Sequence, residues 1–340
     1  MKKQDFSSSH FVISRTDSIG DVILTLPMAH VLKLNFPDST ISFLGRSYTR
    51  DIIECCKSVD NFIDWDEIKI KGSSKAFNEL NIDVFIHVFP VKEIARAVRK
   101  AKTPIRIGTS HRLYHLRTCN KLINLGRKNS DLHEAQLNLK MLESLNIQLD
   151  YNLDEIAGMY NMEINPELPE AIRSKIDSDK YNLILHPTSK GSAREWGLNN
   201  FSQLIDLLPE DKFSIFFTGT KEEGGRIHKD LIEKHPKVHD LTGRLNLKEL
   251  ISFISLSDGL VAASTGPLHI SAALGKQAIG IFAPMRPIHP GRWAPIGRKA
   301  SHLVQKKSCD DCRKRNHCDC IASISPESVS ACLPIGTSAK

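Results

Sequence analysis

The sequence predicts an α/β protein with two Rossmann-like domains that face each other across a cleft. Its 340 residues exceed what one ordinary hydrophobic core organises. Short apolar runs alternate with helical stretches along most of the chain, which is typical of parallel sheets covered by helices. The alternation lapses over residues 150–180, a polar stretch with two prolines, and then resumes. We therefore expect domains at 1–170 and 171–305, followed by a cysteine-rich extension at 306–340.

The expected strands are the apolar runs at 10–15, 40–46, 83–90 and 104–110, then at 181–189, 213–220, 258–265 and 277–284. Helices are expected at 91–102 and 132–145, where the chain reads VKEIARAVRKAK and LHEAQLNLKMLESL. A doubly wound sheet binds ligands beyond the carboxyl ends of its strands. Four loops with candidate chemistry each follow an expected strand, which is where that rule places a site.

Charge is concentrated in one segment. The chain carries a net charge of +7, but residues 92–128 alone hold eleven Lys and Arg against a single acid, Glu93. Such a segment favours an anionic partner such as phosphate groups, nucleic acid or an acidic lipid surface. A solvated helix face explains it equally well. No apolar stretch is long enough to span a membrane and no secretory signal is recognisable, so a cytoplasmic protein is expected.

The first loop, TDSIGDV, follows the first expected strand. Gly20 would permit a tight turn, and Asp21 would then open the next helix, where the helix dipole favours an ionised carboxylate. An ionised carboxylate can accept a proton from an attacking hydroxyl. Taken alone, the motif fits an ordinary first-turn acid better than a catalyst. It lacks the GxGxxG dinucleotide pattern.

The second loop, HPTSKGSAREWG, combines hydroxyls and cations within seven positions, namely Thr188, Ser189, Lys190 and Arg194. Hydroxyls donate hydrogen bonds to phosphate oxygens, and a guanidinium neutralises their charge. The loop therefore favours a phosphate or diphosphate site. The alternative is a surface loop that Trp196 anchors to its domain.

The third loop, STGPLHISAALG, begins a helix. Thr265 is a good N-cap, Pro267 suits the first turn, and Gly266 would let a ligand approach the backbone. Free N–H groups there form an anion site, and His269 could add a hydrogen bond. Together with the second loop, this one predicts a diphosphate-bearing donor. In the fourth loop, TGTKEEGGR, Glu222 or Glu223 could accept hydrogen bonds from sugar or ribose hydroxyls, or could be an ordinary solvated helix start.

The extension contains a cluster of four cysteines, Cys309, Cys312, Cys318 and Cys320. A CxxC pair with two further thiols can form a tetrahedral zinc site. The spacing between the pairs is shorter than in usual zinc knuckles, so reduced thiols or disulfides are alternatives. Neighbouring Lys and Arg also suggest electrostatic attraction to a membrane surface.

These four loops, in this order, resemble the glycosyltransferase family that contains the lipopolysaccharide heptosyltransferases. The matching pieces are RTDSIGDVILTLP, HPTSKGSAREW, GTKEE and STGPLHISAALG, with RIGTSHR and HEAQLNL between the first two. The resemblance extends over about residues 11–300. It implies a GT-B fold, a nucleotide-sugar donor that is typically ADP-heptose, and inversion at the anomeric carbon with no required metal or other cofactor.

The resemblance also implies roles for individual residues. The catalytic base falls on Asp21 and the donor-phosphate cation on Arg194. The donor-site acid aligns with Glu222 or Glu223, and the diphosphate-binding turn with Thr265, Gly266 and His269. Some members carry an Asp that contacts the donor where this chain has Ser264, which puts the donor's sugar or base selectivity in question.

The acceptor implied by the resemblance is a phosphorylated or acidic glycolipid reached at the inner membrane surface by peripheral contact. Our acceptor candidates within the basic segment are Arg106, Arg112 and Arg117. A nucleic-acid partner is disfavoured, since Tyr114 is the single aromatic residue of that segment and base stacking requires more. A family member with a different sugar or acceptor, or a noncatalytic nucleotide-sugar-binding protein, remains an alternative.

Overall fold

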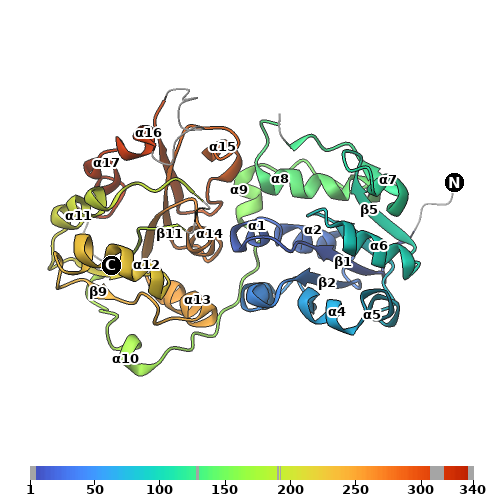
Figure 1. Cartoon of the computed structure of the whole chain (residues 1–340), viewed down its shortest axis with the longest axis horizontal. Coiled ribbons are helices and arrows are strands. Elements are labelled where there is room, and N and C mark those ends of the chain that lie inside the picture. Colours follow the sequence, from blue (N-terminus) through green and yellow to red (C-terminus); the bar gives the residue numbers. More distant parts are fainter. Residues whose placement is uncertain (1–4, 128–129, 190, 192, 307–317, 336–340) are drawn as a thin grey trace. The chain divides into compact units, whose positions relative to one another are not determined.

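The computed structural model of the protein describes residues 5–127, 130–189, 191, 193–306 and 318–335. The chain forms two compact units that divide between Glu163 and Ile164. Over the residues described, each unit is built on one six-stranded sheet whose strand pairs are parallel (Figure 1). The prediction of an α/β protein with two Rossmann-like domains is therefore confirmed.

The sheet of the first unit has the strand order β3-β2-β1-β4-β5-β6. Its central strand β1 lies between β2 and β4, with Val12 opposite Ser42 on one side and Phe85 on the other. The direction of winding reverses at this pair, which makes the β1/β4 boundary the topological switch point. The strands are β1 (His10–Ser14), β2 (Thr40–Gly45), β3 (Asn61–Asp64), β4 (Val84–His87), β5 (Ile105–Thr109) and β6 (Lys121–Ile123).

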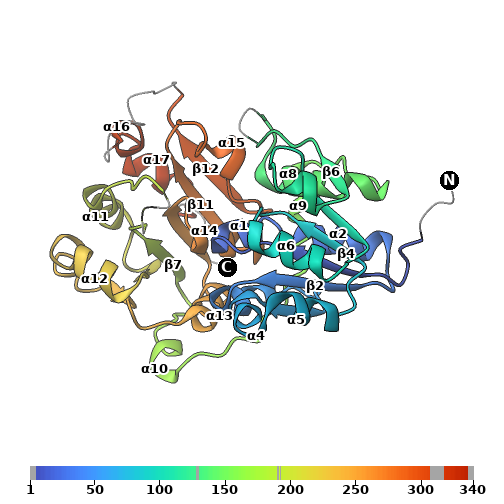
Figure 2. The same cartoon turned by 45° about the vertical axis from the view of Figure 1, so that its right-hand side comes forward.

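Helices cover both faces of this sheet. Helices α4, α5 and α6 share a core with the strands, in which Phe77, Ile94 and Val98 pack with Val12 and Phe85. Helices α5 and α6 lie side by side (Figure 2), and α2 packs against α8. The helices are α1 (Ile19–Ile23), α2 (Pro27–Asn35), α3 (Arg50–Glu54), α4 (Trp65–Lys71), α5 (Ser73–Glu79), α6 (Lys92–Lys100), α7 (His115–Thr118), α8 (Glu134–Leu139) and α9 (Leu153–Ala157), with 3-10 turns at Ser47–Thr49 and Lys140–Leu145.

The second unit repeats this topology with the order β12-β11-β10-β7-β8-β9, so its switch point lies between β7 and β10. Its strands are β7 (Tyr181–His186), β8 (Phe213–Phe217), β9 (His239–Asp240), β10 (Gly259–Ala263), β11 (Gln277–Phe282) and β12 (Ala300–Val304). Its helices are α10 (Glu170–Arg173), α11 (Leu198–Leu207), α12 (Lys221–Ile227), α13 (Leu247–Leu256), α14 (Gly266–Ala273), α15 (Pro290–Trp293), α16 (Asp319–Ala322) and α17 (Pro326–Ser330), with a π-helical turn at His228–Ile232.

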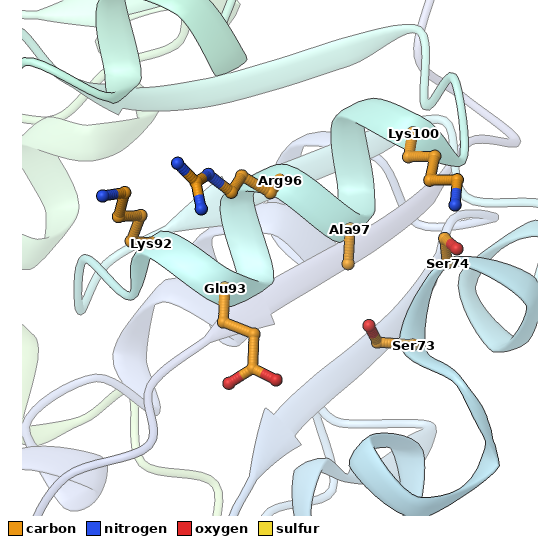
Figure 3. A pocket seen from close by; sticks show the side chains of 7 residues that line it. All are labelled: Ser73, Ser74, Lys92, Glu93, Arg96, Ala97 and Lys100. Carbon is orange, nitrogen blue, oxygen red and sulfur yellow. The ribbon is translucent and has the colours of Figure 1, made fainter.

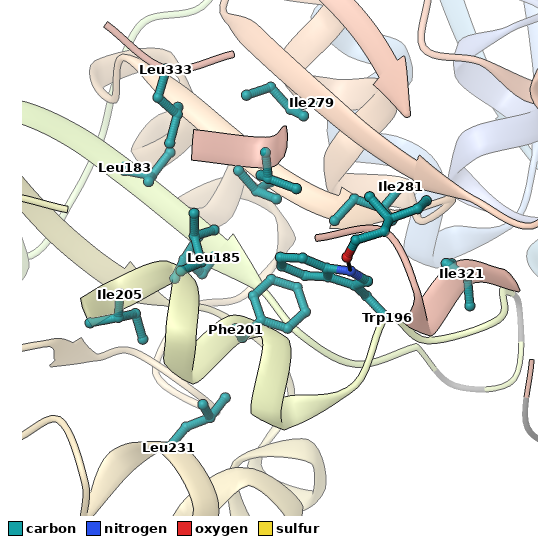
Figure 4. Packing of buried hydrophobic residues seen from close by; sticks show 14 of the residues in the cluster. Leu183, Leu185, Trp196, Phe201, Ile205, Leu231, Ile279, Ile281, Ile321 and Leu333 are labelled. Carbon is teal, nitrogen blue, oxygen red and sulfur yellow. Dashed lines mark hydrogen bonds between the residues drawn. The ribbon is translucent and has the colours of Figure 1, made fainter. Parts of the chain in front are cut away.

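The described part of the C-terminal extension belongs to the core of the second unit (Figure 4). Cys318, Cys320 and Ile321 are buried in the cluster that contains Trp196. The Trp196 indole N–H donates to the Ile324 carbonyl at 2.8 Å. Trp196 therefore anchors its loop to this segment, as the structural alternative for that residue predicted.

The expected strands are found within a few residues of their predicted ends, and the helix at 91–102 is α6. The helix expected at 132–145 ends earlier, because the chain tightens into a 3-10 helix after Leu139. Gly20 was expected in the turn after β1. It is instead the second residue of α1. Strands β3, β6, β9 and β12 were not predicted. In the part of the chain that the structure describes, no helix has the length and apolar character needed to cross a membrane.

Candidate active site

The loop after β1 brings Asp21 to the switch point of the first unit. The apolar strand ends at Ser14, Ser18 occupies the N-cap position of α1, and Asp21 lies in the first helical turn. The Ser18 hydroxyl donates to the Asp21 carboxylate at 2.5 Å. Asp21 thus accepts a hydrogen bond from the N-cap residue of its own helix, and its side chain keeps 18% of its surface exposed. Both a structural and a chemical role are compatible with this position.

The main partner of Asp21 is Arg15, a residue that the sequence analysis did not single out. Arg15 is 3% exposed, and its guanidinium pairs with Asp21, with Asp17 at 2.7 Å and with Glu134 at 3.2 Å. Burial lowers the pKa of Arg15, but the three carboxylates outweigh burial and raise it. The guanidinium is thus a fixed positive charge that orients Asp21.

A second layer of polar residues from α8 holds Arg15 in place. Glu134 is 1% exposed and accepts from both Arg15 and Arg127. The Asn138 carbonyl accepts from Arg127 at 3.0 Å, while its amide donates to the Thr25 hydroxyl at 3.0 Å. That hydroxyl donates in turn to the Asp21 carbonyl. Helices α1 and α8 are therefore joined by one connected polar network, the kind that fixes side-chain geometry when every member is paired.

Asp17 is the second carboxylate on the Arg15 guanidinium. Burial raises the pKa of Asp17 to about 6; the Arg15 charge opposes this rise and the Asp21 charge adds to it. A carboxyl group with a pKa near neutrality is poised to exchange protons at working pH. Asp17 stands in the motif RTDSIGD, but its burial could not be inferred from that motif.

In the second unit, three candidate loops leave the same edge of the sheet, because β10, β7 and β8 are neighbours. Thr188 follows β7, Thr220 follows β8 and Thr265 follows β10. Loops at the carboxyl ends of adjacent parallel strands form one continuous site. The structure thus places the described starts of these three loops at one edge of the sheet.

Helix α14 begins at this edge. Thr265 is at its N-cap position, as predicted, with an extended backbone at φ −128° and ψ 164°. Its side chain makes no capping hydrogen bond, and its buried hydroxyl has no hydrogen-bond partner among the described residues. Pro267 is in the first turn and His269 is buried. Backbone N–H groups and an unpaired hydroxyl together form a donor-rich cradle suited to an anion.

The loop after β7 is closed by its own hydrogen bonds. The Ser189 N–H donates to Glu195 at 2.7 Å, and the Ser189 hydroxyl donates to the Ala193 carbonyl at 2.9 Å. Glu195 also pairs with Arg226 at 2.9 Å. Arg194 is half-buried beside this closure. Lys190 lies outside the described residues, so its proposed phosphate contact stays a prediction.

The two acids of α12 have different environments. Glu222 is exposed, whereas Glu223 is buried and forms a capping box with Thr220, whose N–H donates to it at 2.8 Å. Burial would raise the pKa of Glu223, but the Thr220 hydrogen bonds and the nearby His186 lower it. Glu223 therefore stabilises the loop after β8, and Glu222 is the more accessible of the two to a ligand.

The acceptor candidates of the first unit also differ from one another. Arg106 donates through Nε to the Thr118 carbonyl at 2.7 Å and through Nη1 to the Thr103 carbonyl. Arg106 thus ties β5 to neighbouring loops. Arg112 and Arg117 are exposed. A ligand can reach these two without breaking hydrogen bonds that hold the fold.

The zinc prediction is not tested by the structure. Cys309 and Cys312 lie outside the described residues, and Cys318 and Cys320 are buried among apolar side chains. Among the residues that are described, no group of three His, Cys, Asp or Glu side chains could hold a metal ion.

Each unit is doubly wound, and such sheets bind ligands beyond the carboxyl ends of their strands at the switch point. The model of the family described as glycosyltransferase family 9 (heptosyltransferase) matches residues 82–320, which is more than half of the chain. The chain therefore belongs to glycosyltransferase family 9 and is a glycosyltransferase. Asp21 lies outside the matched residues, so its role depends on the geometry of the first unit.

Known proteins resemble the chain over most of its length. Lipopolysaccharide heptosyltransferase 3 of Escherichia coli is 22% identical over 282 residues, which cover 77% of this chain and 80% of that protein. A glycosyltransferase family 9 protein from Veillonella parvula has a similar structure, with a TM-score of 0.78, 20% identity and 97% of both chains covered. The E. coli ADP-heptose lipopolysaccharide heptosyltransferase II gives a TM-score of 0.73 at 16% identity, covering 96% of this chain and 97% of that one. These likenesses confirm the predicted GT-B fold class.

Proposed function

We propose that this glycosyltransferase transfers a heptose from ADP-heptose to a lipopolysaccharide core acceptor, with inversion at the anomeric carbon. The description of the family names heptosyltransferases. One protein of similar structure is an ADP-heptose lipopolysaccharide heptosyltransferase. The observation that carries the proposal is the buried Arg15 guanidinium holding Asp21 at the switch point of the first unit. A carboxylate oriented in this way supports the assignment of Asp21 as the general base.

The donor diphosphate would bind at the start of α14. The N–H groups beginning at Gly266, the Thr265 hydroxyl and His269 would donate hydrogen bonds to its oxygens. Arg194 and Lys190 would neutralise the charge that develops on the leaving phosphate. Thr188 and Ser189 belong to the neighbouring loop, and Glu222 would accept from sugar or ribose hydroxyls. Ser264 stands where some family members carry a donor-contacting Asp, so it would be the position that alters donor selectivity.

The chemical step would be a single displacement. Asp21 accepts the proton of an acceptor hydroxyl, and the hydroxyl oxygen attacks the anomeric carbon. The bond from that carbon to the diphosphate breaks, its electron pair leaves with ADP, and the proton stays on Asp21 until solvent removes it. One displacement inverts configuration, so the step needs no second carboxylate as nucleophile. The proposal also needs no metal ion, because donors of the protein stabilise the leaving group.

Asp17 is a second candidate for the base. It shares the Arg15 guanidinium with Asp21, and burial raises its pKa to about 6. A base with a pKa near the working pH is efficient in proton transfer. We favour Asp21, because the resemblance to the family places the catalytic base at this position.

The acceptor would be a phosphorylated or acidic glycolipid that Arg112 and Arg117 contact through its phosphates. Both cations are exposed, and the basic segment around them would also favour peripheral contact with an anionic membrane surface. For the cysteine cluster we retain structural zinc as a proposal, tested by metal analysis of protein purified without chelators. A metal content well below one per chain would contradict it.

The test of the function is a donor screen against core oligosaccharide acceptors, read by mass spectrometry, with the product linkage read by NMR. We expect ADP-heptose to give a product with inverted anomeric configuration. Retained configuration, or transfer from a different sugar nucleotide alone, would contradict the proposal. Nucleotide-sugar binding without any product would instead favour the noncatalytic alternative.

A further inference from the structure

The first unit has a pocket between α5 and α6 that the proposed reaction does not use (Figure 3). Its volume is about 470 Å³. Helix α5 contributes Ser73 and Ser74, and α6 contributes Lys92, Glu93, Arg96 and Lys100. The lining thus combines three cations, two hydroxyls and one carboxylate. Asp21 is not among these residues, because it follows β1.

The three cations form one row because of helical periodicity. Ile94, Ala95 and Val98 are buried, and Ile94 and Val98 face the core shared with the sheet. Lys92, Arg96 and Lys100 are spaced four residues apart, so they share the opposite face. With a rise of about 1.5 Å per residue, their backbones extend over about 12 Å along the helix. The row is long enough for a ligand with more than one charged group.

These cations differ from several other cations of the same unit. Arg15, Arg46, Arg50 and Arg127 each pair with at least one carboxylate. Within the described part of the chain, Lys92, Arg96 and Lys100 make no ion pair and no side-chain hydrogen bond. Figure 3 shows the Glu93 side chain extending away from Lys92 and Arg96, and Lys100 reaching toward Ser74. Glu93 is the one carboxylate of the lining, so the pocket carries three cations against a single acid.

We propose that this pocket binds a phosphate-bearing ligand. The Arg96 guanidinium offers a planar fork that matches phosphate oxygens, while the two lysines contribute point charges along the row. Ser73 and Ser74 add hydroxyl donors on the α5 side. The lining contains no aromatic side chain for base stacking, which disfavours a single-stranded nucleic acid. This inference does not depend on the transfer reaction, because none of these residues is assigned to the base, the donor or the acceptor. The three cations do belong to the basic segment for which membrane contact is proposed.

The first test is a calorimetric titration of the full-length protein with inorganic pyrophosphate. Arg96→Gln and Lys100→Gln should each weaken one pyrophosphate site about five-fold, as is typical for the loss of one exposed charge contact. Lys75→Gln is the matched control, since Lys75 is exposed on α5 and does not line the pocket. Pyrophosphate bound by the second unit contributes equally to all four proteins, so the difference isolates the pocket.

The second test identifies the source of the phosphate. Co-sedimentation with vesicles of phosphatidylglycerol is compared with vesicles of phosphatidylcholine. Weaker sedimentation of Arg96→Gln with the anionic vesicles alone would assign a lipid headgroup, and weaker pyrophosphate binding alone would assign a free phosphate compound. Both results support the site. If the Arg96 and Lys100 variants matched Lys75→Gln in both tests, the site would be disproved and the row would be an ordinary solvated helix face.

Discussion

The two units share one strand order but present opposite chemistry at their switch points. In the first unit the loop after β1 gathers Arg15, Asp17 and Asp21, all held by ion pairs. In the second unit the loops after β7 and β10 present hydroxyls and the start of a helix, and the Thr265 hydroxyl has no partner in the described structure. The fold therefore places a site, and the residues of the loops decide what it does.

The two switch points also differ in how their polar groups are held before a ligand binds. A buried ion-pair network fixes the position of a carboxylate but makes the fold sensitive to the loss of one partner. An unpaired hydroxyl beside a helix start costs some stability until a ligand supplies an acceptor. We therefore expect substitutions in the first unit to change stability and proton transfer, and substitutions in the second unit to change ligand affinity.

The largest effect is expected for Glu134→Gln. Glu134 is buried and pairs with both Arg15 and Arg127, so its removal takes one carboxylate from each cation in a buried network. We expect a loss of about 3 kcal/mol in the free energy of unfolding, measured in urea. The control is Glu54→Gln, because Glu54 is half exposed and pairs with Arg50 at the surface, where less than about 0.5 kcal/mol is expected. Equal losses in the two variants would contradict a buried network.

The next effect concerns His87, which ends β4 on the other side of the same switch point. Burial lowers its pKa to about 3, with His115 and Arg106 adding to the shift. The unfolded chain binds a proton at this residue below about pH 6.5 and the folded chain does not, so stability falls as pH drops from 6.5 toward 3.

Between pH 6.5 and pH 5 this contribution amounts to about 2 kcal/mol. His87→Phe should remove it, so that urea midpoints at the two pH values converge in comparison with the wild-type protein. His111→Gln serves as the control, since His111 is exposed. An unchanged pH dependence in His87→Phe would show that another group causes the acid sensitivity.

The third effect tests whether Asp17 tunes the base. Below about pH 6 the Asp17 carboxylate takes up a proton, and Arg15 then pairs more strongly with Asp21, which opposes the proposed proton transfer. We expect kcat/KM to fall by up to about ten-fold per pH unit below pH 6. In Asp17→Asn the fall of kcat/KM below pH 6 should disappear. Asp38→Asn, a change at an exposed acid, should keep this fall. If kcat/KM of Asp17→Asn still fell with the same pH midpoint as in the wild-type protein, Asp17 would be excluded as the titrating group.

The smallest effect is expected in the second unit. Thr265→Val removes a hydroxyl that has no internal partner in the described structure, so the free energy of unfolding should change by less than about 0.5 kcal/mol. Affinity for ADP, measured by calorimetry, should fall about five-fold if that hydroxyl binds a phosphate oxygen. Thr40→Val, at an exposed position in the first unit, controls for the loss of a hydroxyl. Unaltered ADP affinity would remove Thr265 from the donor site.

The sequence predicts the strands well where they are buried on both faces, because such strands are continuous apolar runs, as in β1 and β8. It misses β6, because two of the residues in that strand are exposed, and it misses β9, because that strand has only two residues. Neither strand is a continuous apolar run. The position of Thr265 before a helix was also predictable from its type and from the Pro267 that follows it.

The Arg15 network could not be predicted, because Glu134 lies 119 positions after Arg15 in the chain and approaches it only in the folded protein. The choice between Glu222 and Glu223 was within reach of sequence reasoning. Thr220 and Glu223 have the spacing of a capping box, which directs Glu223 back to the helix start. Long-range pairing requires the structure, whereas this local pairing needed only the right motif.

The division of labour between the two switch points is tested most directly by measuring kcat and ADP affinity together in Asp21→Asn. The account predicts a fall in kcat of at least about 100-fold, as expected for the loss of a general base, with ADP affinity and the urea midpoint close to those of the wild-type protein. A variant that kept full turnover, or one that lost ADP binding, would contradict the assignment of proton transfer to the first unit and donor binding to the second.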